Sequence, residues 1–366
     1  MSIETFLAQL GNRQDPTTGA ISMPIHMSTT YEHPELGRST GFDYTRTKNP
    51  TRSVLEEGLA KLENGTHAVA TSSGMSAIQL IFGLYPTGSH FLVIRDVYGG
   101  SFRYFNALEE NGQATFDYFE SYEDLEELLS DDVAAVFIET PTNPLMKEIS
   151  ISKVAEMAKP FGAQVIVDNT FLTPLRQKPL DEGATISVHS GTKYLTGHND
   201  VLSGVVITND KAVGEKLCWL ANTTGPTLSP FDSWLFLRSL KTLPIRFERQ
   251  EATAKKVAAA LETIPGIDEV LYPGKGAMLS IKVSDENRIK EILKSLKVFT
   301  YAESLGGVES LITHPVTQTH ADIPVEIRES YGLTNSLLRL SIGLEDPDDL
   351  IGDLRRALGN EQVSGQ

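Results

Sequence analysis

Short apolar runs alternate with helical patterns across the first two thirds of the chain, and this alternation restricts the possible folds more than any other feature. Helical periodicity fills segments such as 123–130 and 151–162. Strands separated by helices pair in parallel, and ligands bind beyond the carboxyl ends of such strands. The sequence therefore predicts an α/β fold around a mostly parallel sheet. The runs rich in Val, Ile and Phe lie at residues 90–96, 133–139, 164–168 and 185–189.

The pattern changes after residue 246. A long helical stretch at 247–266 leads to an apolar run at 277–283, and a further helix precedes the run "LLRLSIGLE". The first fifty residues are polar and carry few helix signals. We therefore expect three parts: an extended N-terminal arm at 1–50, an α/β domain at 51–246 and a smaller α+β domain at 247–366.

Composition excludes several classes of protein. The 366 residues carry a formal net charge of −16, which argues against binding the phosphate backbone of nucleic acids. Cys218 is the single cysteine, so an internal disulfide and a thiolate metal site are excluded. No apolar run is long enough to span a membrane, and the N-terminus does not read as a secretory signal. We expect a cytoplasmic protein. No metal is expected either, because no known metal motif matches the spacing of His189, His198, His314 and His320.

Polar residues follow the predicted strands where each strand ends. "SSGMSA" places Gly74 and Met75 at a helix start, which suits an anion, although a plain N-cap would have the same pattern. Asp168 ends a continuously apolar run, where a carboxylate is costly unless it is paired. An N-cap or a structural ion pair would also explain a carboxylate at this position. Further strand ends carry Asn143 and, in "SGTK", Ser190, Thr192 and Lys193.

Asp168 and Lys193 are 193 − 168 = 25 residues apart, about one strand–helix–strand unit. Adjacent strands would hold both residues on one rim of the sheet. A lysine, a carboxylate and a hydroxyl-rich phosphate cradle together suit pyridoxal 5′-phosphate (PLP), which bonds to a lysine and needs an acid at its ring nitrogen. The sequence thus predicts a PLP site.

Motifs that occur in the same order along nearly the whole chain connect this prediction to a known family. The segment "SVHSGTKYLTGHNDVLSG" resembles the PLP-lysine signature of the Cys/Met-metabolism (transsulfuration) enzymes, and "YTRTKNPTR", "SSGMSA", "DVYGG", "ETPTNP", "VDNTF", "SLGGVESL" and "LLRLSIGLE" match the same family. The resemblance implies the fold-type-I architecture of PLP-dependent transferases. It also implies a homotetramer built from dimers that share their sites.

The resemblance assigns a role to each matching residue. Lys193 would carry the cofactor as a Schiff base and then act as the base, Asp168 would hold the pyridinium and Tyr98 would stack on the ring. Arg339 would bind the substrate α-carboxylate, a bidentate task that suits a guanidinium, with Ser304 beside it. The other implied cofactor contacts are Gly74, Met75, Ser190 and Thr192 at the phosphate, Asn143 near the 3′ oxygen, and Tyr44 and Arg46 at the phosphate of a neighbouring subunit.

The choice of reaction depends on fewer residues. Glu303 matches a glutamate of γ-active members, and Arg103 matches an arginine that meets the distal end of the substrate in cystathionine γ-synthases. Gly100 stands where methionine γ-lyases have cysteine. Thr47 replaces a second arginine of succinyl-using members, which favours a neutral acyl group. The resemblance therefore implies γ-replacement on O-acylhomoserine, preferably the acetyl ester, with cysteine or sulfide, in methionine biosynthesis.

Two alternatives stay open. The first is a cystathionine γ- or β-lyase, which shares the cofactor and the early chemistry. The second is a catalytically silent PLP-binding or regulatory protein, against which the presence of Lys193, Asp168, Tyr98 and Arg339 argues.

Overall fold

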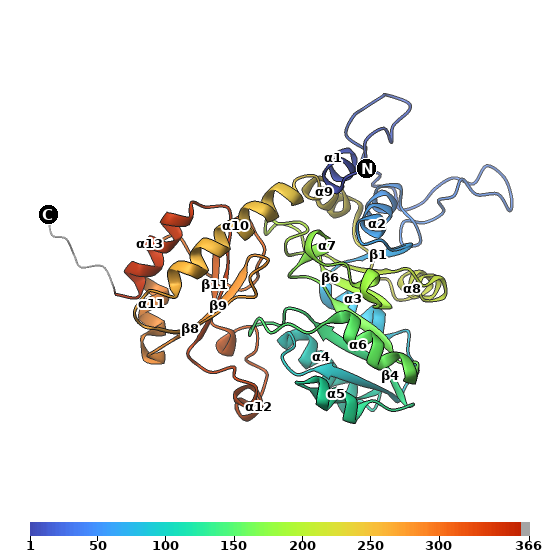
Figure 1. Ribbon diagram of the computed structural model, residues 1–366. Helices are drawn as coiled ribbons and strands as arrows, with labels where there is room; N and C mark the ends of the chain where they lie inside the picture. Colours follow the sequence, from blue (N-terminus) through green and yellow to red (C-terminus); the bar gives the residue numbers. More distant parts are fainter. Residues whose placement is uncertain (360–366) are drawn as a thin grey trace.

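A seven-stranded sheet forms the centre of the larger lobe of the computed structural model, which describes residues 1–359 (Figure 1). The strand order is β1-β7-β6-β5-β4-β2-β3, and β7 is the strand that runs antiparallel to its neighbours. The predicted α/β class with a mostly parallel sheet is confirmed. The strands are β1 (His67–Thr71), β2 (Ser89–Ile94), β3 (Ala114–Phe119), β4 (Val133–Glu139), β5 (Gln164–Asp168), β6 (Ile186–Ser190) and β7 (Gly204–Thr208).

Helices bury both faces of this sheet. Along β7, Val206 packs into the hydrophobic cluster that contains α3, whereas Val205 and Ile207 pack into the cluster that contains α2. Because side chains alternate across a strand, α2 and α3 lie on opposite faces. The helices of this lobe are α2 (Pro50–Leu62), α3 (Gly74–Phe82), α4 (Gly99–Glu110), α5 (Tyr122–Leu128), α6 (Ile151–Ala158), α7 (Thr173–Arg176), α8 (Lys211–Thr224) and α9 (Pro230–Leu240), with short 3-10 turns at Lys159–Phe161 and Pro179–Glu182.

One long helix, α10 (Leu243–Leu261), runs from the larger lobe to a second sheet (Figure 1). The order of this five-stranded sheet is β10-β11-β12-β9-β8. The expected domain boundary after residue 246 falls inside α10, so the helix itself is the connection and the boundary stays a proposal. The remaining elements are β8 (Ile267–Leu271), β9 (Met278–Val283), α11 (Ile289–Ser295), β10 (Thr300–Tyr301), β11 (Leu311–Thr313), α12 (Val325–Ser330), β12 (Leu337–Ser341) and α13 (Pro347–Ala357), with 3-10 turns at Glu286–Arg288 and Pro315–Thr317.

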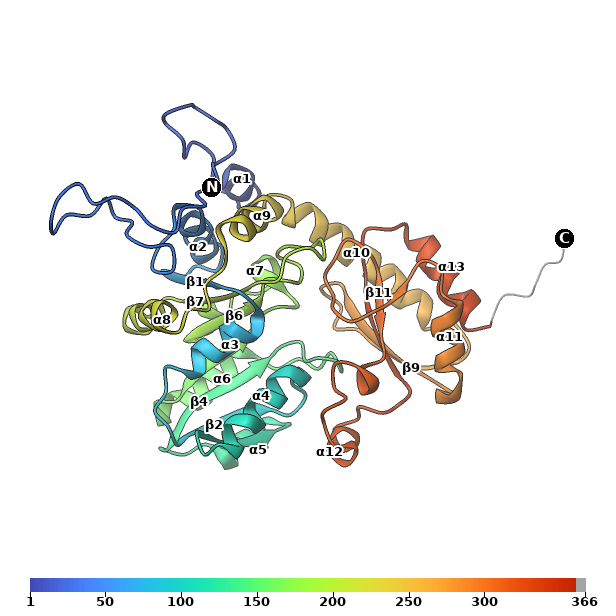
Figure 2. The same ribbon diagram turned by 180° about the vertical axis from the view of Figure 1, so that it is seen from behind.

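The N-terminal segment extends away from the body of the molecule in both views (Figures 1 and 2). It begins with a short helix, α1 (Ile3–Gln9), which the sequence analysis did not expect. Ser2 caps this helix by accepting a hydrogen bond from the Thr5 amide, and Leu7 anchors it in the core. Residues 10–49 then form loops with isolated bridges, as the absence of helix signals suggested.

Two further observations concern residues 1–359. No helix in this range has the length and apolar character to cross a bilayer. Likewise, the described side chains include no cluster of three His, Cys, Asp or Glu residues placed to hold a metal ion.

Candidate active site

A cavity of about 270 Å³ opens at the carboxyl ends of β4, β5 and β6, where the two lobes meet. This is the edge at which ligands of parallel sheets bind. Eleven of the residues singled out by sequence line it, although Tyr44, Arg46 and Arg103 do not. The eleven are Gly74, Met75, Tyr98, Asn143, Asp168, Ser190, Thr192, Lys193, Glu303, Ser304 and Arg339.

The start of α3 provides the anion-binding side of the cavity. Ser73 caps the helix by accepting a hydrogen bond from the Ser76 amide at 3.0 Å, which leaves the first amides of the helix free for a ligand. A Cβ atom at Gly74 would lie 2.9 Å from the Cβ of Ser190, so only glycine lets α3 approach the end of β6 this closely. Together the helix start and the hydroxyls of Ser190 and Thr192 can hold a phosphate.

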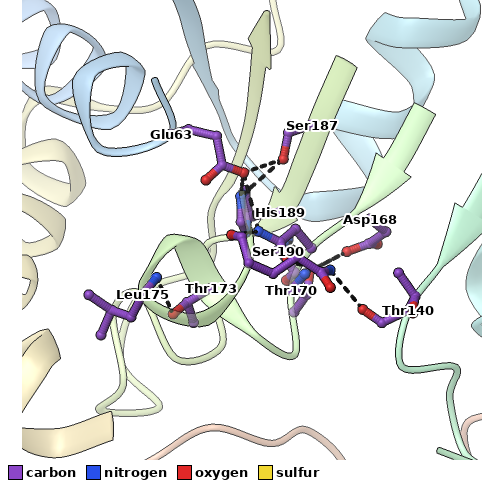
Figure 3. Close-up of polar contacts among 11 residues, drawn as sticks. Glu63, Thr140, Asp168, Thr170, Thr173, Leu175, Ser187, His189 and Ser190 are labelled. Atoms are coloured by element: carbon purple, nitrogen blue, oxygen red, sulfur yellow. Dashed lines mark hydrogen bonds and ion pairs between the residues drawn. The ribbon is translucent and has the colours of Figure 1, made fainter. Parts of the chain in front are cut away.

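Asp168 is fixed by the loop that follows it (Figure 3). The amide of Thr170 donates to Asp168 Oδ1 at 3.0 Å, and the Thr170 hydroxyl donates to the same oxygen. That hydroxyl in turn accepts a hydrogen bond from the Ser190 amide at 2.8 Å, which ties β5 to β6. Burial raises the pKa of Asp168, while the two bonds from Thr170 lower it. A cationic ring nitrogen would therefore find an oriented carboxylate here.

A fully buried polar cluster lies beside this loop (Figure 3). Glu63 Oε1 accepts hydrogen bonds from His189 Nε2 at 3.0 Å, from Asn169 Nδ2 at 3.2 Å and from the Ser187 hydroxyl. These bonds join the C-terminal end of α2 to β6 and to the residue after Asp168. His189, which belongs to no metal motif in the sequence, has a structural role in this cluster.

Lys193 follows the end of β6, and its side chain lines the cavity. Its Nζ donates to the Ser304 hydroxyl at 2.7 Å. Burial, together with the charge of Arg339, lowers the pKa of Lys193 to about 8, so a neutral amine is accessible near physiological pH. Ser304 holds this contact with a backbone φ of +85°, a conformation that costs energy for any residue but glycine and that recurs at functional sites.

Arg339 reaches the cavity from the smaller sheet. Its neighbours Leu338 and Leu340 point into the apolar core, so strand alternation directs Arg339 to the opposite face. Arg339 is 2% exposed, and its guanidinium donates to Asn143 Oδ1 at 2.8 Å, to the carbonyl of Ser304 at 3.1 Å and to the Thr313 hydroxyl at 3.3 Å.

These three acceptors of Arg339 are all neutral, and its Nε has no partner within residues 1–359. Burial lowers the pKa of Arg339 to about 10. The structure provides hydrogen bonds for this cation but no carboxylate within ion-pair distance in the described chain, and the charge of Glu303 acts on it only from farther away. A buried cation without an anion suits an anionic ligand.

Tyr98 immediately precedes α4, and its ring lies against Gly100. A Cβ at Gly100 would come within 2.5 Å of Tyr98 Cε1, so the glycine has a packing reason in addition to its place in the family pattern. Burial raises the pKa of the Tyr98 phenol, and the nearby charge of Arg103 opposes this shift.

Sequence reasoning missed Glu139, which lines the same cavity at the end of β4 and is 5% exposed. Its Oε1 accepts a hydrogen bond from the Tyr98 amide at 2.9 Å. The signal was present, because Glu139 ends an apolar run as Asp168 does. Thr170 and Thr319 also line the cavity and were missed, since isolated threonines in loops carry no distinctive pattern.

Three predicted residues lie elsewhere. Tyr44 and Arg46 are on the N-terminal arm, where Tyr44 is 47% exposed and the Arg46 guanidinium lies 5.5 Å from the centroid of the Tyr44 ring. Arg103 forms an ion pair with Asp322 at 2.6 Å, with 65% of the arginine side chain exposed. None of the three takes part in the cavity of its own chain, so their assigned roles stay proposals.

Comparison with known proteins identifies the family. The Cys/Met metabolism PLP-dependent enzyme family matches residues 4–359. The chain belongs to this family. It is 50% identical to cystathionine gamma-synthase/O-acetylhomoserine (thiol)-lyase of Bacillus subtilis, over 97% of this chain and 96% of the relative. It is 43% identical to cystathionine gamma-lyase of the same organism, over 98% of this chain and 100% of that one.

A solved structure agrees with this assignment. Cystathionine gamma synthase from Xanthomonas oryzae in complex with cystathionine superimposes with a TM-score of 0.96 at 40% identity, covering 98% of each chain. The expected PLP-dependent transferase architecture is confirmed. The protein is a PLP-dependent enzyme.

The residues that line the cavity also fit this cofactor, independently of the comparisons. The free amides of α3 and the close approach at Gly74 suit the phosphate, Asp168 suits the ring nitrogen and Lys193 lies in the same space. PLP, when bound, supplies an electron sink for charge that develops at the substrate α-carbon.

Proposed function

We propose that this enzyme catalyses γ-replacement on an O-acylhomoserine, with the acetyl ester favoured and with cysteine as the nucleophile, to give cystathionine. Sulfide in place of cysteine would give homocysteine, which places the enzyme in methionine biosynthesis. The observation that carries the proposal is the buried guanidinium of Arg339, which faces a cavity containing Lys193 and lacks an anionic partner in the described chain. An amino-acid carboxylate supplies that anion.

The cofactor-facing residues keep the roles that the family resemblance gave them. Gly74, Met75, Ser190 and Thr192 hold the phosphate, Asn143 lies near the 3′ oxygen and Tyr98 stacks on the ring. Asp168 orients and charges the ring nitrogen. Lys193 is the covalent anchor and, with its lowered pKa, the base that moves the α-proton. Ser304, which accepts a hydrogen bond from the free lysine amine, would hold that amine once substrate has displaced it from the cofactor.

Two observations support the acetyl ester. Arg103, which would attract a distal carboxylate, already pairs with Asp322 at 2.6 Å. Thr47, which replaces a second arginine, donates to Asn222 Oδ1 at 2.9 Å and brings no charge. A succinyl ester would therefore gain less from this chain than from one with two free arginines. Glu303 lines the cavity beside Ser304, where it can contact the group that the substrate carries on its γ-carbon.

A cystathionine lyase is the second candidate, and the B. subtilis γ-lyase at 43% identity favours it. Both reactions use the same cofactor and the same α-proton removal, so the residues described above serve either one. The two reactions differ in their later steps. In a synthase a nucleophile adds to the substrate, whereas in a lyase a group is eliminated and water completes the cycle.

One experiment separates these candidates. Purified protein is incubated with O-acetylhomoserine, O-succinylhomoserine or cystathionine, each with and without cysteine, and the products are identified by mass. The proposal requires cystathionine from the acetyl ester plus cysteine, at a rate above the rate of cystathionine cleavage. Faster release of cysteine or homocysteine from cystathionine would assign a lyase instead. If none of the substrates is turned over, the catalytically silent PLP-binding or regulatory protein is the remaining candidate.

The assembly and location follow from the same family assignment as proposals. Tyr44 and Arg46 sit on an exposed arm, which is where a contact to a second chain would have to be made. We propose a homotetramer of site-sharing dimers. A cytoplasmic location remains a prediction based on the single cysteine.

A further inference from the structure

Glu139 is the titratable group of the cavity to which the proposed reaction gives no task. It is the Cα partner of Asp168 in the parallel pair β4–β5. Neighbouring strands lie about 4.8 Å apart, and paired residues project to the same face, so the two carboxyls share one edge of the sheet. Both line the cavity.

The surroundings of Glu139 are acidic at close range. Asp168 and Asp96 both act on it with negative charge, and its hydrogen bond from the Tyr98 amide is a neutral one. None of the ion pairs within residues 1–359 includes Glu139. A buried carboxylate with such neighbours is costly to ionise. The titratable groups that face the cavity with it are Tyr98, Asp168, Lys193, Glu303 and Arg339.

We propose that Glu139 is a positioning residue that keeps its proton, so that its neutral carboxyl fixes the backbone of Tyr98 and leaves Asp168 as the charged member of the pair. Asp168 has the better claim to the charge, because two donors from Thr170 bond to it. Glu139 has a single donor.

The acid–base preferences of the two groups agree with this division. Burial, followed by the charge of Asp168, raises the pKa of Glu139 well above its ordinary value. Burial raises the pKa of Asp168 as well, but the two hydrogen bonds from Thr170 oppose that rise. The donors around the two carboxyls and these directions both favour the proton on Glu139.

The hydrogen bond to Tyr98 gives Glu139 its positioning role. Tyr98 is the N-cap residue of α4, and its own side chain makes no capping hydrogen bond. Glu139, 41 residues away in sequence, supplies an acceptor at this helix start instead. With the ring of Tyr98 packed on Gly100, the backbone and the ring are held from two sides. Tyr98 can then present its ring to the cofactor without further ordering.

Two substitutions in the PLP-loaded enzyme distinguish the effect of the Glu139 hydrogen-bond acceptor from the effect of a charge on Glu139. Glu139→Gln keeps an acceptor oxygen and is neutral, as the protonated acid is. Glu139→Met keeps the approximate volume and removes the acceptor. The readouts are the infrared spectrum, the retention of PLP on dialysis and the pH profile of cofactor absorption. They need no substrate, so they are independent of the reaction proposed above. Thermal unfolding shows that each variant is folded.

The proposal predicts that the difference spectrum between wild type and Glu139→Gln at neutral pH contains the C=O stretch of a protonated carboxyl. Glu139→Gln should retain PLP within about threefold of wild type with an unmoved absorption profile, and Glu139→Met should lose about tenfold or more because the Tyr98 amide loses its partner.

Two results would overturn the proposal. If the protonated-carboxyl band is the same in wild type and Glu139→Gln, the carboxyl is ionised in the folded enzyme. If Glu139→Gln shifts the absorption profile or weakens PLP retention as much as Glu139→Met does, the charge of Glu139 matters and its acceptor does not explain its role. Should Glu139→Met fail to fold, the infrared comparison with Glu139→Gln decides alone.

Discussion

The cavity and the N-terminal arm are two parts of one proposed site, and their surroundings differ sharply. Residues around the cavity are buried and tied by several hydrogen bonds each, as Arg339 is by three acceptors. On the arm, the Arg46 guanidinium lies over the Tyr44 ring, and Tyr44 is 47% exposed. Side chains that must be held in place are supported by burial or by a partner. The cavity is therefore preorganised within one chain, whereas in the proposed dimer the arm would gain the same order from a second chain.

The largest effect should come from the centre of the cavity. Lys193→Ala removes both the anchor and the base, and we expect turnover to fall by at least about a thousandfold. Borohydride reduction of the wild-type enzyme followed by peptide mass analysis should place the cofactor on Lys193. Labelling of another lysine would show that the cavity has been assigned to the wrong residue.

Lys193 should also make the stability of the PLP-free protein depend on pH. Its pKa of about 8 in the fold lies below the ordinary 10.5, so the unfolded chain binds more protons between these values. Stability then rises as pH increases from about 8 towards 10.5, by up to about 3 kcal/mol.

The comparison is with Lys193→Met, which lacks this group. Denaturant unfolding across the pH range should show the difference between the two proteins closing as pH rises. A difference that stays constant with pH would mean that the lysine is well solvated and the cavity less preorganised than described.

Arg339 tests the substrate side of the cavity. Replacing it with lysine keeps a charge but loses the paired geometry, and a charged hydrogen bond contributes about 1.5–3 kcal/mol. We expect kcat/KM for the amino-acid substrate to fall by about 10- to 100-fold with PLP content unchanged. Loss of PLP in step with activity would assign Arg339 to the architecture of the site and not to the substrate.

The smallest effect concerns the acyl group, because Thr47 and Arg103, its proposed contacts, are exposed and lie outside the cavity of their own chain. We expect the acetyl ester to be used at least as well as the succinyl ester. Thr47→Arg should move the ratio of specificity constants towards the succinyl ester, and Arg103→Ala should move it away, each by about tenfold or less since exposed charges are screened. The measurement is made at fixed, moderate salt. A wild-type preference of tenfold or more for the succinyl ester would contradict this interpretation of the acyl-group contacts.

Sequence patterns predicted those parts of the molecule that depend on periodicity and local motifs. The runs that became β4 and β5 have the predicted bounds, and Asp168, Ser190 and Lys193 meet at the predicted edge. Glu139 ends an apolar run as Asp168 does, but its place beside Asp168 depends on the register between β4 and β5, which is not visible in one sequence. The ion pair of Arg103 with Asp322 joins residues 219 apart, a contact that no local pattern encodes.

Mixing two inactive variants tests most directly whether the arm of one chain completes the cavity of another. Lys193→Ala keeps an intact arm, and Arg46→Ala keeps an intact lysine. Each is assayed alone and after subunit exchange, at a PLP concentration where Arg46→Ala alone is inactive. In a site-sharing dimer, random exchange should restore about a quarter of wild-type activity, because half of the dimers are mixed and each has one complete site. No recovery after exchange has been verified by native mass spectrometry would contradict the sharing of sites.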